Sequence, residues 1–118
     1  MSILKVKDYF RKYDMEKRII ELEVSSATVE MAAIGLGCEG KRIAKSLGFL
    51  INDKPVLVVA AGDARVDNSK FKKYFKTKAS MIPFDKVNEL IGHDVGGVCP
   101  FGINDNVKVY LDISLKRF

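Results

Sequence analysis

The spacing of apolar residues predicts helices in four parts of the chain. In each part, apolar side chains recur three and four residues apart, the period that gathers them on one face of a helix. Ser26 is the expected N-cap of the second helix, and Gly35 and Gly37 mark its end. Asp67 or Asn68 is the expected N-cap of the third. The four segments are the first dozen residues, residues 29–36, the basic segment from residue 68 and the residues that follow Pro83.

Alternating apolar and polar residues predict strands in much of the remaining chain. The clearest case is 107–115, where every second residue is Val, Leu or Ile, and a shorter alternation covers 18–24. Two apolar runs, 44–51 and 55–61, are separated by a turn and predict a hairpin. The second run is apolar on both faces, which is typical of a central strand. The fold class is therefore mixed α/β, in one domain that spans residues 1–118.

Composition narrows the class of protein. A chain of 118 residues, with 47% hydrophobic and 30% charged residues, is long enough to fold without disulfides or metal. The longest apolar run has seven residues, whereas a membrane span needs about 20. The N-terminus is amphipathic and carries acid, so it does not resemble a signal peptide. We therefore expect a cytoplasmic protein that does not enter a membrane, with Cys38 and Cys99 reduced.

Positive charge gathers in one segment. Residues 65–78 contain six basic residues and one acid, and this segment accounts for the whole net charge of +5. A local excess of this kind indicates a patch that meets a polyanion, most often a nucleic acid. The alternative is a solvated helix face whose lysines only aid solubility. The candidate contacts to nucleic acid are Lys70, Lys72, Lys73 and Lys76.

Lys45 is unusual because it shares a predicted strand face with apolar residues. In residues 44–51, alternation places it beside Leu47, Phe49 and Ile51. An ammonium on an apolar face is costly unless it reaches water, a partner or a ligand. Either the lysine extends to solvent from the start of the strand, or it is held at the lip of a pocket. In a pocket it could polarise a carbonyl or bind a phosphate.

The segment 92–102 (GHDVGGVCPFG) contains four glycines and a proline, which excludes a regular helix. Paired glycines allow close backbone approach and present N–H groups that can bind an oxyanion. A simple turn is the alternative, although a turn needs fewer residues. The segment is neither a dinucleotide-binding nor a P-loop motif, so it gives no support for a nucleotide cofactor.

His93 and Cys99 lie within this segment. His93, the single histidine, has three open roles: general base, hydrogen-bonding core residue, or cap at a helix C-terminus. Cys99 precedes Pro100 in an apolar setting, which favours a buried, inert thiol. With two cysteines and one histidine, the chain cannot build a zinc site of four cysteines or of two cysteines and two histidines.

Five segments occur in a specific order along the chain: SSATVEMAA, RIAKSLGF, AGDARVD, GHDVGGVCPFG and VYLDISLKRF. In this order they resemble the YbaK/ProX/EbsC family, small aminoacyl-tRNA deacylases related to the editing domain inserted in bacterial prolyl-tRNA synthetases. The resemblance runs over the whole chain. It implies a single YbaK-like α/β domain, with a curved, mostly antiparallel sheet flanked by short helices. It also implies that no metal or other cofactor is needed.

The resemblance implies hydrolysis, in trans, of the ester between a wrong small amino acid and the 3′ end of a tRNA. The implied substrate is cysteine on the tRNA for proline, with alanine or serine in related members. The family's lysine falls on Lys45 and the neighbouring hydroxyl on Ser46. Its glycine-rich loop falls on Gly96 and Gly97, and we expect His93 beside them to contact substrate. Lys45 and loop N–H groups would stabilise the oxyanion, while a cysteine substrate's own thiol attacks its carbonyl.

One departure from the family lies at the end of the chain. Family members continue past LKRF through a second glycine-rich loop that also lines the pocket, then a strand and a helix. We therefore expect a C-terminally shortened domain whose exposed sheet edge can pair with another chain. The departure supports a second hypothesis, a non-catalytic module that binds a tRNA end or prolyl-tRNA synthetase.

Overall fold

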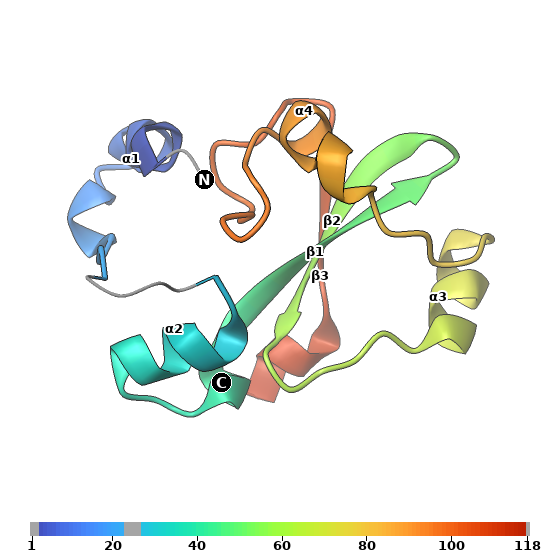
Figure 1. Cartoon of the computed structure of the whole chain (residues 1–118), viewed down its shortest axis with the longest axis horizontal. Coiled ribbons are helices and arrows are strands. Elements are labelled where there is room, and N and C mark those ends of the chain that lie inside the picture. The colour runs from blue at the N-terminus through green and yellow to red at the C-terminus, as the bar shows by residue number, and fades with distance from the viewer. Residues whose placement is uncertain (1–2, 23–26, 118) are drawn as a thin grey trace.

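A twisted β-hairpin forms the centre of the computed structural model, which describes residues 3–22 and 27–117 (Figure 1). Strand β1 (Ala44–Ile51) pairs antiparallel with β2 (Lys54–Ala61) along its whole length. The two turn residues, Asn52 and Asp53, both have positive φ angles, 50° and 65°. This is the two-residue turn whose twist matches that of the strands it joins. The predicted hairpin is confirmed.

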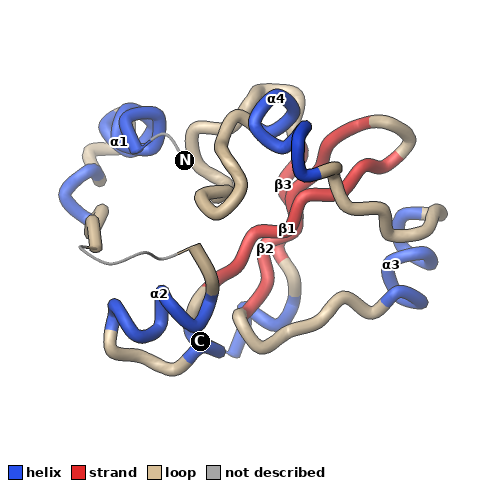
Figure 2. The backbone as a smooth tube through the Cα atoms, viewed as in Figure 1, coloured by secondary structure: helices blue, strands red, loops and turns tan. Residues whose placement is uncertain are grey.

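A third strand completes the sheet in the described part of the chain. Strand β3 (Lys108–Leu111) pairs in parallel with β2, so the order is β1-β2-β3 and β2 is central, as its apolar faces predicted. Figure 2 shows the three strands crossing the middle of the molecule with helices around them. Antiparallel pairing covers eight residue pairs and parallel pairing four. The predicted fold class, a mixed α/β domain with a mostly antiparallel sheet, is confirmed.

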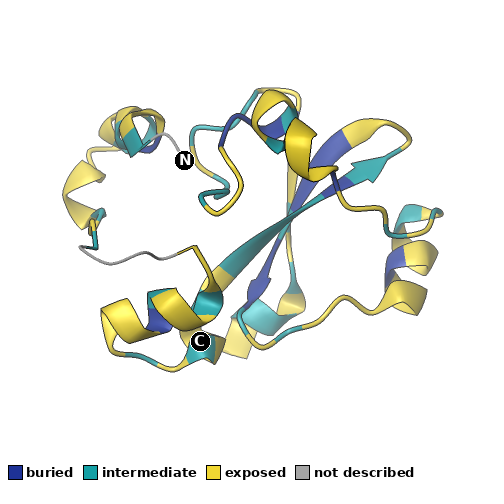
Figure 3. Ribbon diagram, in the orientation of Figure 1, coloured by how far each residue is buried: buried dark blue, intermediate teal, exposed yellow. Residues whose placement is uncertain are grey.

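The sheet separates two apolar clusters. Successive residues of a strand point to opposite faces, so Phe49 and Val56 pack on one face and Leu57 on the other. Phe71 of the basic helix covers the first face and Ile91 covers the second. Figure 3 shows buried residues concentrated along the hairpin, with further buried positions on the surrounding helices. The two faces therefore carry different layers, and this division decides where the site lies.

The helices agree with the predicted pattern, with small differences in where they begin. Thr28, not Ser26, is the N-cap of the second helix; its hydroxyl accepts from the Met31 N–H, and Ser26 lies outside the described residues. Gly37 ends that helix in a left-handed conformation, whereas Gly35 lies within it. The α-helices of the described ranges are α1 (Ile3–Arg11), α2 (Val29–Leu36), α3 (Asn68–Phe75) and α4 (Val87–Ile91), and the 3₁₀ turns are Glu16–Arg18, Gly40–Arg42, Phe84–Lys86 and Ile113–Arg117.

The strand predicted over 18–24 is wrong in the part that the structure describes. Arg18 ends a 3₁₀ turn, and residues 19–22 have no regular secondary structure. Residues 23 and 24 lie outside the described ranges. Alternation favours a strand only where another strand is available to pair with it. Here Ile20 is 70% exposed, and the segment borders the cleft described below.

The strand predicted over 107–115 is too long. It ends at Leu111, and Ile113–Arg117 forms a 3₁₀ turn instead. The Asp112 carboxylate accepts a hydrogen bond from the Ser114 N–H (2.9 Å), and the Ser114 hydroxyl accepts one from the Ala61 N–H (3.0 Å). Short polar side chains that bond to nearby backbone compete with sheet pairing in this way.

Candidate functional site

A cleft of about 850 Å³ takes most of its apolar lining from the Leu57 face of the sheet, opposite α3, and Lys45 and Leu47 of the edge strand β1 also line it. Its walls come from α2, the start of β1, α4, the loop that follows α4, and the N-terminal arm (residues 3–22). Apolar side chains such as Val29, Ile82 and Val98 line most of it, with charged groups among them. A concave, mostly apolar cavity with a few polar groups is the usual form of a small-ligand site.

The cleft joins the residues that the sequence singled out. Lys45 and Ser46 line it from β1, and Gly96 lines it from the loop after α4. The structure therefore brings together the predicted lysine, its neighbouring hydroxyl and one of the two predicted glycines. Gly97, His93 and Cys99 do not line it within the described part of the chain.

The Lys45 ammonium is held by backbone carbonyls at the end of β2. Nζ donates to the Gly62 carbonyl at 3.3 Å and to the Ala64 carbonyl at shorter range. An ammonium has three donors, so these bonds leave one for a ligand. The side chain is half-buried, which answers the question left open by the sequence. Lys45 does not extend freely into solvent; the loop after β2 fixes its charge beside the cleft.

Gly96 presents its backbone to the cleft. Its φ of 88° lies in the left-handed region that favours glycine. In the described residues no hydrogen bond engages its N–H. The Gly97 N–H, in contrast, donates to the Asp94 carbonyl at 3.0 Å and closes a turn. Of the two glycines, only Gly96 thus offers a backbone donor to a ligand.

His93 and Cys99 organise the loop from inside. His93 is fully buried, and its Nε2 lies 2.7 Å from the Phe101 carbonyl oxygen. Because a carbonyl only accepts, this nitrogen carries the proton. The opposite nitrogen, Nδ1, is buried and has no hydrogen-bond partner among the described residues. Cys99 Sγ lies 3.7 Å from the same Nε2, and burial raises the pKa of the thiol. The role of hydrogen-bonding core residue fits His93 best.

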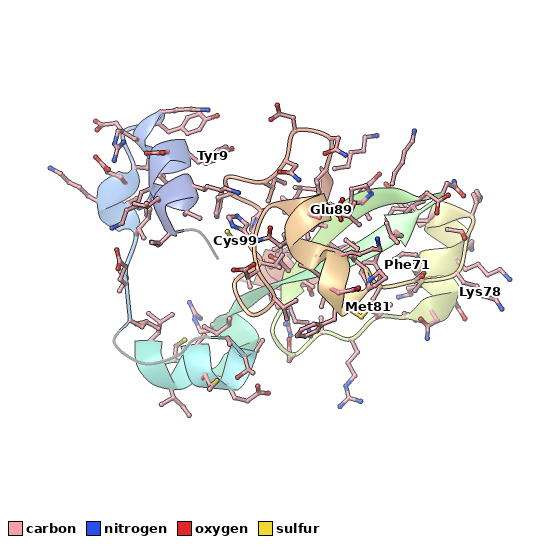
Figure 4. All side chains as sticks on the ribbon, turned by 45° about the horizontal axis from the view of Figure 1, so that its top comes forward. Tyr9, Phe71, Lys78, Met81, Glu89 and Cys99 are labelled. Carbon is pink, nitrogen blue, oxygen red and sulfur yellow. The ribbon has the colours of Figure 1, made fainter. Side chains whose placement is uncertain are left out.

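The N-terminal arm is anchored on the same loop. Lys5 Nζ donates to the Gly92 carbonyl at 2.9 Å, and the Phe10 and Phe101 rings meet edge to face at 4.7 Å. A Cβ at Gly102 would lie 2.9 Å from the Lys5 carbonyl oxygen, so the helix can approach only because this residue is glycine. Figure 4 shows Tyr9 on α1 facing the loop that carries Cys99. These contacts fix the arm relative to the cleft.

The predicted basic patch lies on the other side of the sheet. Asp67 caps α3 by accepting from the Lys70 N–H at 3.0 Å, as expected. The Phe71 ring packs 4.9 Å from the Phe49 ring, on the face away from the cleft. Figure 4 shows Tyr9 and Lys78 at opposite ends of the molecule. The exposed lysines of the patch are Lys70, Lys72, Lys73 and Lys76.

Several cleft residues were missed by sequence reasoning. Arg18, Glu21 and Arg42 line the cleft and give it charge beside Lys45. The sequence pattern predicted a strand that contains Arg18 and Glu21. Nothing in the pattern indicated that this segment lies close to the hairpin. Arg42 lies three residues before Lys45, and the pair of cations so close to a predicted strand start was the one signal that could have found it.

Two absences among the described residues bear on the class of site. These residues contain no group of three or more His, Cys, Asp or Glu side chains placed to hold a metal ion. Among their helices, none has the length and apolar character needed to cross a membrane.

Comparisons with known proteins bear on the family of the chain. The family model described as "Aminoacyl-tRNA editing domain" matches residues 23–118. The uncharacterized protein YwhH of Bacillus subtilis (strain 168) is 49% identical over the whole chain, which covers 76% of YwhH. The proline–tRNA ligase of Aquifex aeolicus (strain VF5) is 33% identical over 90 residues, 75% of this chain. That match covers 16% of the ligase, so it concerns one part of a much larger protein.

Solved structures show the same fold. A structure described as a candidate trans-editing enzyme for prolyl tRNA synthetase has a TM-score of 0.85 and 28% sequence identity. The match covers 98% of this chain and 74% of that one. The hypothetical protein APE2540 has a TM-score of 0.79 and 27% identity, over 92% of this chain and 73% of its own. At 98% coverage, the first match leaves almost none of the N-terminal arm out, although the arm precedes the family match.

Proposed function

Since this chain belongs to the aminoacyl-tRNA editing domain family, we propose that it is a deacylase acting in trans on tRNA that carries a wrong small amino acid. We further propose cysteine on the tRNA for proline as the substrate, with alanine or serine as the alternative. The observation that supports this most directly is the cleft, which Lys45, Ser46 and Gly96 line together. Its volume suits the aminoacylated end of a nucleic acid strand.

The chemistry proposed for the cleft is stabilisation of a developing negative charge. Cleavage of an ester passes through a tetrahedral oxyanion, and preorganised donors at that oxygen lower the barrier. The Lys45 ammonium and the Gly96 N–H would supply two such donors, and the Ser46 hydroxyl would help to orient the substrate. With a cysteine substrate, the substrate thiol loses its proton and attacks the carbonyl carbon, and the ribose oxygen leaves and takes up a proton. Water then opens the resulting thiolactone and releases cysteine. The protein then mainly holds the reacting atoms together.

The other two predicted site residues of the loop, Gly97 and His93, have structural roles in this proposal. Gly97 closes the turn that exposes Gly96, since its N–H donates to Asp94. His93 was expected to contact substrate, but it is fully buried and bonds to the Phe101 carbonyl. We propose that it acts through the loop as a positioning residue.

The proposed partners follow from the substrate. The first partner is the aminoacylated 3′ end of a tRNA. The second is prolyl-tRNA synthetase, which the name of one structural relative mentions. A cytoplasmic location belongs to the same proposal. Self-association through β3 is a further proposal, because β3 stands at the sheet edge with Leu111 73% exposed.

Replacement of Lys45 tests the proposed mechanism. Lys45→Ala removes the ammonium beside the cleft and is expected to lower kcat/KM for cysteinyl-tRNA(Pro) roughly 100- to 1000-fold, the cost of losing an oxyanion donor. The measurement is deacylation of labelled aminoacyl-tRNA, corrected for spontaneous hydrolysis. Lys54→Ala, which removes an exposed lysine from the same hairpin, is the matched control and should change the rate less than about twofold.

The same assay separates the two functional hypotheses. If the parent chain hydrolyses the ester well above the spontaneous rate, the non-catalytic binding module is excluded. Equal rates for the parent and Lys45→Ala, with both proteins folded, would remove the lysine from the mechanism.

A further inference from the structure

The N-terminal arm forms one wall of the cleft, and the residues of this wall lie outside the family match. The match begins at residue 23, whereas Arg18, Ile20 and Glu21 line the cleft from the arm. The arm is not loosely placed, because Lys5 and Phe10 hold it against the loop that carries Gly96. Residues of the arm therefore have a fixed position relative to the cleft.

Glu21 differs in charge from the other ionisable residues there. Among the described residues that line the cleft it is the one acid, and the basic residues are Arg18, Arg42 and Lys45. Its carboxylate is paired with Lys7 of α1, and the Glu21 side chain remains 57% exposed. A carboxylate has about four acceptor positions. Lys7 can thus orient it while positions remain for a ligand.

An aminoacyl ester at neutral pH carries a positive α-ammonium beside the carbonyl that is attacked. Three cations along the cleft repel this group, and a carboxylate attracts it. The substrate can therefore bind in one polarity, with its carbonyl oxygen toward Lys45 and its ammonium toward Glu21. We propose that Glu21 binds the α-ammonium and makes the cleft selective for amino acids with a free amino group. This inference rests on the proposed function, since it concerns the same site.

A binding experiment tests the role of Glu21 without requiring turnover. The probe is alanine joined by an amide to 3′-amino-3′-deoxyadenosine, which mimics the aminoacylated end and has no ester to cleave. Its N-acetylated form lacks the positive charge. Affinities of the parent chain, Glu21→Gln and Glu16→Gln are measured by calorimetry at pH 6.5, below the ordinary α-amino pKa of roughly 7.7. Glu16 is a matched control because it lies on the same arm, is paired with Arg11 and does not line the cleft.

The parent chain and Glu16→Gln are expected to bind the free amine at least about tenfold more tightly than the acetylated probe, the effect of one charged hydrogen bond. In Glu21→Gln the two affinities should be nearly equal. No preference in the parent chain, or a parent-like preference in Glu21→Gln, would overturn the inference.

A separate measurement of turnover distinguishes failure of this inference from failure of the proposed function. Deacylation of cysteinyl-tRNA(Pro) by the parent chain tests catalysis, whereas the amide probes test only recognition of the amino group. Absence of turnover together with a Glu21-dependent preference would reject the deacylase and keep the ammonium site. Turnover without that preference would keep the deacylase and reject the role of Glu21.

Discussion

At the scale of single residues, two backbone carbonyls hold the Lys45 ammonium beside the cleft. Lys45 was unusual because it occupied an apolar strand face, and the structure places it beside the cleft. What the sequence could not show is how its charge is held. The Gly62 and Ala64 carbonyls belong to the loop after β2, and their approach depends on the hairpin being folded. His93 was left with three roles for the same reason, since its partner lies across the loop.

Cys99 provides a test of whether the protein supplies a nucleophile. Burial raises the pKa of this thiol, so little thiolate is present at neutral pH. Cys99→Ala is therefore expected to keep kcat/KM within about threefold of the parent value, because a thiol is not required for the proposed chemistry. The measurement is deacylation at pH 7, with thermal unfolding as a control on loop packing. A fall of about 100-fold in a protein that remains folded would make Cys99 the nucleophile.

At the scale of elements, the sequence predicted those whose pattern is supported by local chemistry. The hairpin, the end of α2 at Gly37 and the N-cap of α3 at Asp67 depend on residues close to them in the chain. The errors at 18–22 and 112–115 have one cause: alternation shows that a segment could be a strand, but not that a neighbour will pair with it. The side chains of Asp112 and Ser114 decide the second case.

Asp112 allows this explanation to be measured. Asp112→Asn should lower the free energy of unfolding at pH 7 by about 1 kcal/mol, since the carboxylate accepts the Ser114 N–H. Hydrogen bonds from Ser114 lower the pKa of Asp112 below its ordinary value. This stabilisation is present above the ordinary carboxyl pKa of about 3.9 and is lost as pH falls through the lower pKa of the folded state.

Urea unfolding should therefore show a gap between Asp112→Asn and the parent at pH 7 that narrows below roughly pH 4. Asp105→Asn, at an exposed carboxylate, is the control and should behave as the parent at both pH values. A gap of the same size at low pH would contradict the assigned role of the charge.

At the scale of the whole molecule, most of the cleft lining and the α3 lysines lie on opposite faces of the sheet. The sequence predicted both features but could not relate them, because the relation depends on which face α3 covers. Phe71 fixes that face by packing on Phe49. A tRNA whose end occupies the cleft can reach α3 only around the edge of the sheet. We therefore expect the lysines to contribute to affinity and not to the chemical step.

Salt dependence distinguishes these contributions. Replacing Lys72, Lys73 and Lys76 together by Gln should weaken tRNA binding and reduce the slope of log affinity against log salt by roughly 0.7–0.9 for each phosphate that the variant no longer neutralises. The value of kcat should remain unchanged. The control replaces three exposed lysines elsewhere, Lys12, Lys54 and Lys108. An unchanged slope in the α3 variant would leave its lysines as a solvated surface that aids solubility.

The anchoring of α1 has a consequence for how the protein is made. Lys5 and Gly92 are 87 residues apart in the chain, and Phe10 can make its ring contact only after Phe101 has been synthesised. During synthesis the arm leaves the ribosome long before the loop on which it docks. Contacts this distant in sequence also slow folding, since a long loop must close before they form. A growing chain therefore has its hairpin early and acquires a complete cleft only after the loop through residue 102 has emerged.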